Sequence, residues 1–178
     1  TKRDSHMNKI VDLALTGSRK AKAVKVIGKK PIEDLREWLK RVEGIGELTR
    51  VDQPVDRDEE MSAISYLVAK QQPSPAVLFN QPRGFEKSKI GARLLWNILG
   101  PSVKRVALTL EEPADTPTVE LIRRVKDKLK RRLPPNEVSA ANAPVYENTV
   151  TGKNIDLNQL PIPRHWPPGS ENSRRRTI

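Results

Sequence analysis

The stretch DLREWLKRVEGIGELTRV, residues 34–51, predicts the first two elements of the fold. Pro31 fits the first position of a helix, and Gly44 and Gly46 end it. The run at Leu48–Val51 follows as a short strand. The apolar side chains of the helix recur at amphipathic spacing, at Leu35, Trp38, Leu39 and Val42. A helix that passes directly into a strand is typical of an α/β domain.

Outward from this stretch, helical and strand patterns continue to alternate, and prolines and glycines separate them. The pattern at residues 103–108 fits either a strand or the start of a helix. The predicted fold class is α/β, with a small mixed sheet flanked by helices and followed by an extended arm. The other predicted elements are a helix over 58–72, a strand over 76–79, a helix over 92–99 and a helix over 118–133.

The apolar positions of these elements define a predicted core. Trp38 could also serve as a stacking platform for a ligand, but its spacing within the helix favours core packing. The predicted core residues are Leu35, Trp38, Leu39, Leu48, Ile64, Leu67, Val77, Leu78, Phe79, Leu95, Ile122 and Leu129.

The chain divides into four predicted parts. Residues 1–30 are a flexible basic extension, of which residues 1–6 resemble a cloning remnant. Residues 31–133 form the α/β domain. Residues 134–168 form an extended connector, and residues 169–178 are an atypical basic tail. Because prolines break the connector, we expect its residues from about 143 to 168 to pack poorly on the α/β domain, although they contain a strand candidate at 144–150.

The net charge of +11 is concentrated near the two ends of the chain. Residues 31–158 hold 20 Lys/Arg and 19 Asp/Glu, whereas residues 17–30 hold six basic residues and no acid. A phosphate-binding face belongs to the folded body of a protein, so this distribution argues against nucleic-acid binding. The role of residues 17–30 stays open between a solvated arm and a surface-binding segment.

Composition excludes several further classes of protein. The chain has no cysteine, which excludes disulfides, thiolate metal sites and a cysteine nucleophile. No apolar run is long enough to span a bilayer, and no secretory signal opens the sequence. We therefore expect a cytoplasmic protein without a membrane partner.

No catalytic signature occurs among the nucleotide-binding, zinc-protease and hydrolase motifs. The acidic triplet at 58–60 could ligate a metal, but the helix dipole alone stabilises acids at a helix start. His6 and His165 have no second ligand at metal-binding spacing. The basic run at 123–132 fits a solvated helix face better than a phosphate groove. From the residues alone, the predicted catalytic, cofactor-binding and metal-binding residues are therefore none.

An ordered series of five phrases carries a family resemblance. They are DLREWLKRVEGIGELTRVDQPVD, PAVLFNQPRGF, LLWNILGPSVKRVALTL, NAPVYENTV and IDLNQLPIPRHWP. Together, from residue 32 to about residue 167, they resemble the N-terminal region of the UbiD family of decarboxylases. The last phrase is the most specific of the five.

The resemblance implies a reversible, non-oxidative decarboxylation of an aromatic or α,β-unsaturated carboxylic acid. In that family an N-terminal α/β domain precedes a split barrel that holds prenylated FMN with manganese and potassium. A C-terminal domain then makes the oligomer contacts. The family's catalytic and cofactor residues lie in the barrel and beyond, so no such residue is carried over to this chain.

The resemblance also sets expectations for the connector and the tail. Residues 134–168 would lead toward a missing split barrel. We interpret residues 169–178 as out-of-frame or vector-derived sequence, and the chain as a truncated module that is inactive alone. The alternative is a standalone module whose basic tail is native. A full-length homologous subunit or a second copy is the expected partner. Two alternatives stay open, namely a noncatalytic assembly subunit that docks through the connector and a small basic nucleic-acid-binding protein.

Overall fold

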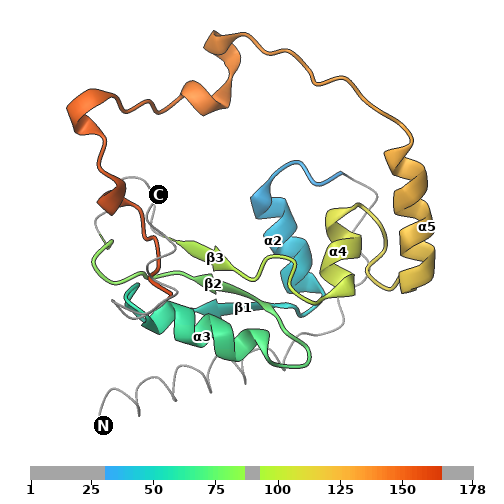
Figure 1. Ribbon diagram of the computed structural model, residues 1–178, viewed down its shortest axis with the longest axis horizontal. Coiled ribbons are helices and arrows are strands. Elements are labelled where there is room, and N and C mark those ends of the chain that lie inside the picture. Colours follow the sequence, from blue (N-terminus) through green and yellow to red (C-terminus); the bar gives the residue numbers. More distant parts are fainter. Residues whose placement is uncertain (1–30, 87–92, 166–178) are drawn as a thin grey trace.

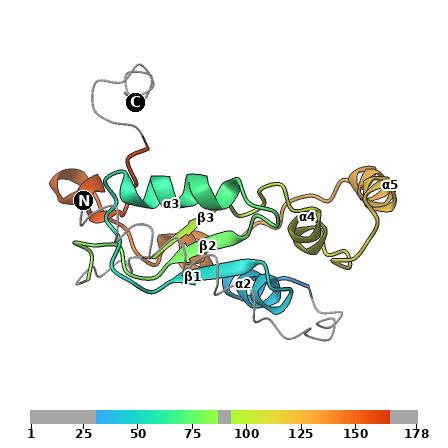
Figure 2. The same cartoon turned by 90° about the horizontal axis from the view of Figure 1, so that it is seen from below.

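The computed structural model describes residues 31–86 and 93–165, in which a three-stranded mixed sheet is covered by helices on both faces (Figures 1 and 2). This arrangement confirms the predicted α/β class. The elements in chain order are α2 (Leu35–Gly44), β1 (Leu48–Val51), α3 (Glu60–Ala69), β2 (Ala76–Phe79), β3 (Leu94–Trp96), α4 (Val103–Thr109) and α5 (Thr118–Leu129).

The sheet has the order β1-β2-β3, with β2 in the centre. β1 runs parallel to β2, and Leu48 lies opposite Ala76 in the register. β3 runs antiparallel to β2, with Leu95 opposite Leu78. All four residues of β2 are buried, as a strand covered on both faces requires.

The core consists of two apolar clusters, one on each face of the sheet. In Figure 2, α3 covers one face and α2 the other. The α3 side contains Val51, Val55, Met61, Ile64, Val68, Val77 and Phe79. The α2 side contains Trp38, Val42, Leu48, Ala76, Leu78 and Leu108. Alternate residues of β1 and β2 therefore serve opposite faces, as the two-residue repeat of a strand dictates.

The first helix begins later than predicted. Its N-cap is Asp34, whose Oδ1 accepts a hydrogen bond of 2.8 Å from the Glu37 backbone N–H. An aspartate at this position satisfies an N–H group that has no partner within the helix. Pro31 therefore precedes the helix instead of opening it, whereas strand β1 has the predicted bounds.

The predicted helix over 92–99 is wrong. Residues 94–96 form strand β3, and Ala92 lies outside the described residues. A short apolar run does not distinguish a strand from a buried helix by periodicity, and here β2 offers an unpaired edge that this run completes. The ambiguous segment at 103–108 is helix α4, and its cap is Ser102, whose Oγ accepts a hydrogen bond from the Arg105 N–H at 3.2 Å.

The predicted core is correct at the sheet and wrong at three helices. Leu35 is exposed at the start of α2 and Leu67 on α3, and Ile122 and Leu129 are exposed on α5. Leu39 and Leu95 are half-buried. The error has one main cause: α5 ends at Leu129 and stands beyond α4, away from the sheet (Figure 1), with Leu121 as its only buried residue.

Polar contacts attach α5 to the end of α4. Glu112 accepts hydrogen bonds from Lys128 Nζ at 2.6 Å and Arg124 Nη1 at 3.0 Å. Lys128 Nζ also donates to the Leu110 carbonyl at 2.7 Å. The bonds from Lys128 and then Arg124 lower the pKa of the Glu112 carboxyl group, because they stabilise its charged form.

The arm after α5 is exposed for most of its length. It contains four short 3₁₀ turns, at Ala140–Asn142, Pro144–Tyr146, Gly152–Asn154 and Leu157–Gln159. The strand candidate at 144–150 is therefore wrong, because no neighbouring strand pairs with it. Leu157 is 67% exposed and Leu160 39% exposed, as expected of a poorly packed arm; Trp166 lies outside the described residues.

The core position of Trp38 gives a first test. Trp38 is 4% exposed, and its Nε1–H donates to Thr109 Oγ1 at 2.8 Å. We expect Trp38→Ala to lower the free energy of unfolding by about 3–5 kcal/mol, measured by urea denaturation. Trp38→Phe keeps most of the apolar volume and loses the hydrogen bond, and should cost about 1–2 kcal/mol. Equal midpoints for Trp38→Ala and the parent chain would contradict the placement of α2.

The attachment of α5 should depend on pH. The folded pKa of Glu112 lies below its unfolded value, so the carboxylate stabilises the fold above about pH 4.3. This contribution is lost as the pH falls through the depressed pKa. Glu112→Gln should therefore lower the urea midpoint at pH 7, and the difference from the parent should shrink toward pH 3.

Asp127→Asn is the matched control for this pH test. Asp127 pairs with Lys130, but both side chains are 69% exposed, so little change is expected at either pH. A difference between Glu112→Gln and the parent that stays constant across the pH range would contradict the assignment.

Candidate functional site

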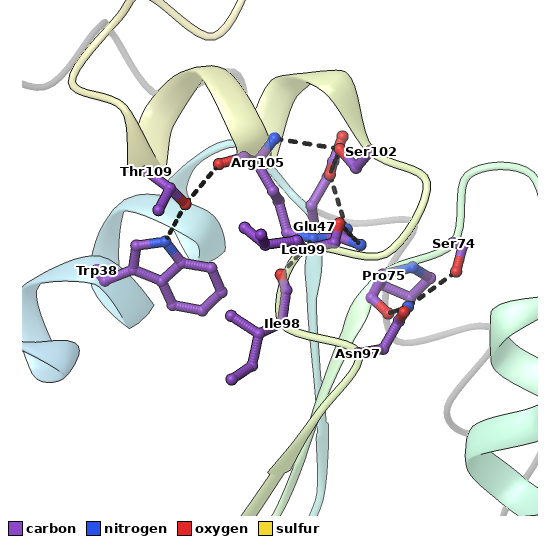
Figure 3. A network of polar contacts seen from close by, with 10 residues as sticks. All are labelled: Trp38, Glu47, Ser74, Pro75, Asn97, Ile98, Leu99, Ser102, Arg105 and Thr109. Carbon is purple, nitrogen blue, oxygen red and sulfur yellow. Dashed lines mark hydrogen bonds and ion pairs between the residues drawn. The ribbon is translucent and has the colours of Figure 1, made fainter. Parts of the chain in front are cut away.

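A buried arginine organises the end of the sheet where α4 begins. Arg105 is fully buried, and Figure 3 shows its guanidinium between Glu47, Ile98 and Leu99. Nη1 donates to Glu47 Oε2 at 2.8 Å, Nε to the Ile98 carbonyl at 2.9 Å and Nη2 to the Leu99 carbonyl at 2.9 Å. Burial lowers the pKa of Arg105, and Glu47 opposes this, but a guanidinium stays charged in proteins.

Neighbouring residues complete this network. Ser102 Oγ donates to Glu47 Oε2, and Asn97 Nδ2 donates to Ser74 Oγ at 2.9 Å and to the Pro75 carbonyl at 2.8 Å. Gly100 has a φ of +51°, and a Cβ there would lie 2.8 Å from Arg105 Nη2. Each buried side-chain polar atom among the described residues has at least one partner, so the network is satisfied from within the domain.

A second polar cluster lies where the arm returns to the core, and we call it the arm seam. It joins Arg164 and His165 to the start of α3 and to β3. The Arg164 N–H donates to the Arg57 carbonyl at 2.9 Å, and Ser62 Oγ donates to the Arg164 carbonyl at 2.8 Å. Arg164 Nε lies 3.1 Å from Asp58 Oδ1. Three contacts thus fix one residue of the arm.

Aromatic rings extend the arm seam on both sides. The His165 and Trp96 rings are tilted toward each other with their centroids 4.7 Å apart. The Arg57 guanidinium lies 5.2 Å from the centre of the Phe85 ring, and its Nη1 donates to the Leu160 carbonyl at 3.3 Å. Each guanidinium of the arm seam already holds a carboxylate, a carbonyl or a ring. The cluster is therefore arranged to position the chain at residues 160–165.

The structure separates the residues that sequence reasoning weighed as ligands. Glu60 Oε2 accepts the Asp56 N–H at 2.7 Å, whereas Asp58 binds Arg164, so the acidic triplet does not converge. The described residues contain no group of three or more His, Cys, Asp or Glu side chains that could hold a metal. His6 and the basic segment at 17–30 lie outside the described residues.

The basic run of α5 and the residues after it is partly paired with acids. Arg124 binds both Glu120 and Glu112, and Lys130 binds Asp127. Sequence reasoning missed Arg105 and Ser62. No local pattern distinguishes a buried arginine from an exposed one, and the Ser62 contact spans 102 residues.

The α/β core matches a known domain. Residues 39–125, from α2 into α5, match the sequence model of the 3-octaprenyl-4-hydroxybenzoate carboxy-lyase N-terminal domain, UbiD_N. Residues 39–125 therefore form a domain of the UbiD N-terminal type. The resemblance drawn from the sequence is thereby confirmed.

Solved structures of a UbiD-like enzyme share this fold. The vanillic acid decarboxylase of Sedimentibacter hydroxybenzoicus (ShVdcCD) in its open form matches 78% of the chain at 30% identity, with a TM-score of 0.66. A second open-form structure, with truncated ShVdcD, gives 78% coverage, 29% identity and a TM-score of 0.67. The closed form matches 72% of the chain at 29% identity, with a TM-score of 0.61. The chain spans only 28%, 28% and 26% of those solved chains.

The described residues contain no cluster of His, Cys, Asp or Glu of the kind that holds manganese. Manganese requires several hard donors in one place, and no such group exists among residues 31–86 and 93–165. A flavin phosphate requires free backbone N–H groups at a helix start. At the start of α4, Ser102 Oγ already accepts the Arg105 N–H, and at the start of α2, Asp34 Oδ1 accepts the Glu37 N–H. We therefore derive no chemical step through the cofactor.

The buried ion pair yields a stability prediction for the UbiD-type domain. Arg105→Leu leaves the Glu47 carboxylate buried without its cation and should cost about 3–5 kcal/mol in urea unfolding. The double variant Arg105→Leu/Glu47→Leu should lose less than the sum of the two single changes, because neither charge remains. Strictly additive losses would show that the two side chains do not interact.

The arm seam yields a prediction about accessibility. Removal of one of its hydrogen bonds should raise the open fraction of the arm about fivefold. Ser62→Ala and Asp58→Asn should therefore speed tryptic cleavage at the exposed Lys153 severalfold under native conditions. Ser139→Ala, a serine of the arm outside the seam, is the control and should leave the rate unchanged. If the two seam variants are cleaved no faster than the control, the seam does not restrain the arm.

Proposed function

We propose that this chain is the N-terminal module of a UbiD-like carboxy-lyase. The complete enzyme would catalyse the reversible, non-oxidative decarboxylation of an aromatic or α,β-unsaturated carboxylic acid in the cytoplasm. The observation that carries the proposal is the likeness to the vanillic acid decarboxylase, which extends over 78% of the chain. That share is larger than the family-matched residues 39–125, so the likeness is not confined to them.

The module's part in that reaction is positional. The Arg105 network fixes the core, and the arm seam fixes residues 160–165 against α3 and β3. Chain that follows residue 165 would thus start from a defined place on this domain. In the proposal, prenylated FMN, manganese and potassium bind to a split-barrel domain, to which residues 134–168 form the connector.

A second candidate function is a noncatalytic subunit that docks on a full-length partner. It is supported by the apolar side chains that the arm exposes, including Val145 at 79% and Leu157 at 67%. Such side chains on an extended segment gain free energy when a partner covers them. A homologous subunit is the expected partner in both proposals.

The activity test uses the purified chain and an in-frame fusion. We expect the chain alone to be colourless, to bind neither prenylated FMN nor manganese tightly, and to release no carbon dioxide from vanillate or cinnamate. Fusion to the split-barrel and C-terminal regions of the vanillic acid decarboxylase should restore flavin absorbance and decarboxylation. Cofactor-dependent decarboxylation by the chain alone would refute the proposal.

A control separates failure of the fusion from failure of the idea. The same fusion with Ser62→Ala/Asp58→Asn should retain flavin absorbance but lose part of its activity, because the arm seam no longer fixes the connector. A stable, flavin-loaded fusion that is inactive, together with tight binding of the chain to the separate enzyme, would favour the docking subunit.

A further inference from the structure

Helix α5 exposes an apolar strip at the outer end of the molecule. Val119 is 63% exposed, Ile122 62% and Leu129 75%. At about 100° per residue, these three side chains fall within a sector about 80° wide. Figures 1 and 2 both show α5 beyond α4 at one extremity, so no described element lies outside it.

Cations share this outer face with the aliphatic residues. On the same helical projection Lys126 lies inside the apolar sector, and Arg123 and Lys130 lie along its border. We call these three cations and the three aliphatic residues the α5 ridge. Its opposite side is attached to the core through Leu121, which is 5% exposed, and through Arg124 and Lys128, which bind Glu112. The α5 ridge therefore points away from the rest of the domain.

Charge in the described body is segregated toward this end. Residues 118–133 hold seven Lys/Arg and two Asp/Glu. By contrast, residues 31–117 hold 12 basic and 14 acidic residues. Residues 134–158 hold one basic and three acidic residues. Within residues 31–158, an anionic surface would therefore attract the α5 end and repel the parts on either side of it.

We propose that the α5 ridge binds peripherally to an anionic lipid surface. The aliphatic side chains enter the boundary between headgroups and acyl chains, and the cations contact lipid phosphates, as in amphipathic helices that lie in the interface. Three aliphatic residues give weak, reversible and salt-sensitive binding. No helix among the described residues is long and apolar enough to cross a membrane, and a helix that lies on the surface needs no such length.

The position of the α5 ridge favours a lipid surface over a protein partner. Its aliphatic and cationic residues share the outward side of α5, and no described element lies beyond that helix, so a flat surface can reach it without collision with the core. This proposal departs from the expectation of no membrane partner, which rested on the absence of a spanning segment. It is independent of decarboxylation, because its test measures no enzyme activity.

The first experiment uses the lack of cysteine in the full chain. Ile122→Cys and Leu129→Cys are each labelled with an environment-sensitive fluorophore and titrated with vesicles of 30% phosphatidylserine in phosphatidylcholine. We expect a blue shift that weakens as salt rises. Val145→Cys, an exposed position of the arm, is the labelled control and should not shift. Vesicle binding without a shift at residues 122 and 129 would overturn the proposal, because another basic segment would then be responsible.

Charge and apolar variants supply the second test. Lys126→Gln/Lys130→Gln should weaken vesicle binding about 25-fold, at about fivefold for each charge. Lys153→Gln in the arm should leave it unchanged. Ile122→Ser/Leu129→Ser should abolish binding, whereas Ile155→Ser/Leu157→Ser should not. Unchanged circular dichroism confirms that the variants fold.

Three outcomes would assign the α5 ridge to another occupant and overturn the proposal. An equal blue shift with pure phosphatidylcholine would remove the role of the anionic lipid. A shift that depends on protein concentration without vesicles would indicate a second copy of the chain. A shift produced as well by polyglutamate as by vesicles would indicate an acidic protein segment.

Discussion

The fold depends on a single buried cation. Arg105 on α4 reaches the residue that precedes β1 and two carbonyl groups that follow β3, so one side chain connects both edge strands of the sheet to the helix beyond them. A planar group with five donors in fixed directions can bond acceptors that lie on different sides of its planar edge, whereas a lysine presents its three donors from a single nitrogen. Removal of a charge from water is costly, and the geometry around Gly100 and Ser102 supplies the bonds that offset this cost.

The contacts of Arg105 also hold the loop that follows the three-stranded sheet. The loop from Asn97 to Ser102 pairs with no described strand. Arg105 binds a carbonyl of this loop at Ile98, and the Asn97 side chain binds the Pro75 carbonyl, directly before β2. Because α4 is fixed by that loop, Thr109 is in place to accept the indole N–H of Trp38. The polar network therefore also sets the packing of α2 on the sheet.

Sequence patterns predicted the elements that rest on local periodicity. The bounds of β1 and β2 and the burial of Trp38 follow from the spacing of apolar residues and from prolines and glycines. Strand β3 was not predicted, because the pairing of Leu94–Trp96 with β2 is a long-range contact that three apolar residues do not indicate. The same holds for the arm seam, since Ser62 and Arg164 are ordinary polar residues until the fold brings them together. On α5 the periodicity was real, but the sequence could not tell whether a core lies against the apolar face.

The arm is a loop attached to the domain at both ends, and this explains why the arm seam consists of several contacts. A segment of about 30 residues that is tied at both ends loses conformational entropy, and a loop of this length costs several kcal/mol to close. The Asp58–Arg164 pair has both side chains 51% exposed, and a pair of that kind contributes too little alone. The Arg164 N–H donates to the Arg57 carbonyl, and the Ser62 hydroxyl donates to the Arg164 carbonyl. These two bonds, together with the contact between His165 and Trp96, must supply the remainder. Because these contacts are individually modest, the arm end is held in one position by their sum, and the loss of any one of them loosens it only in part.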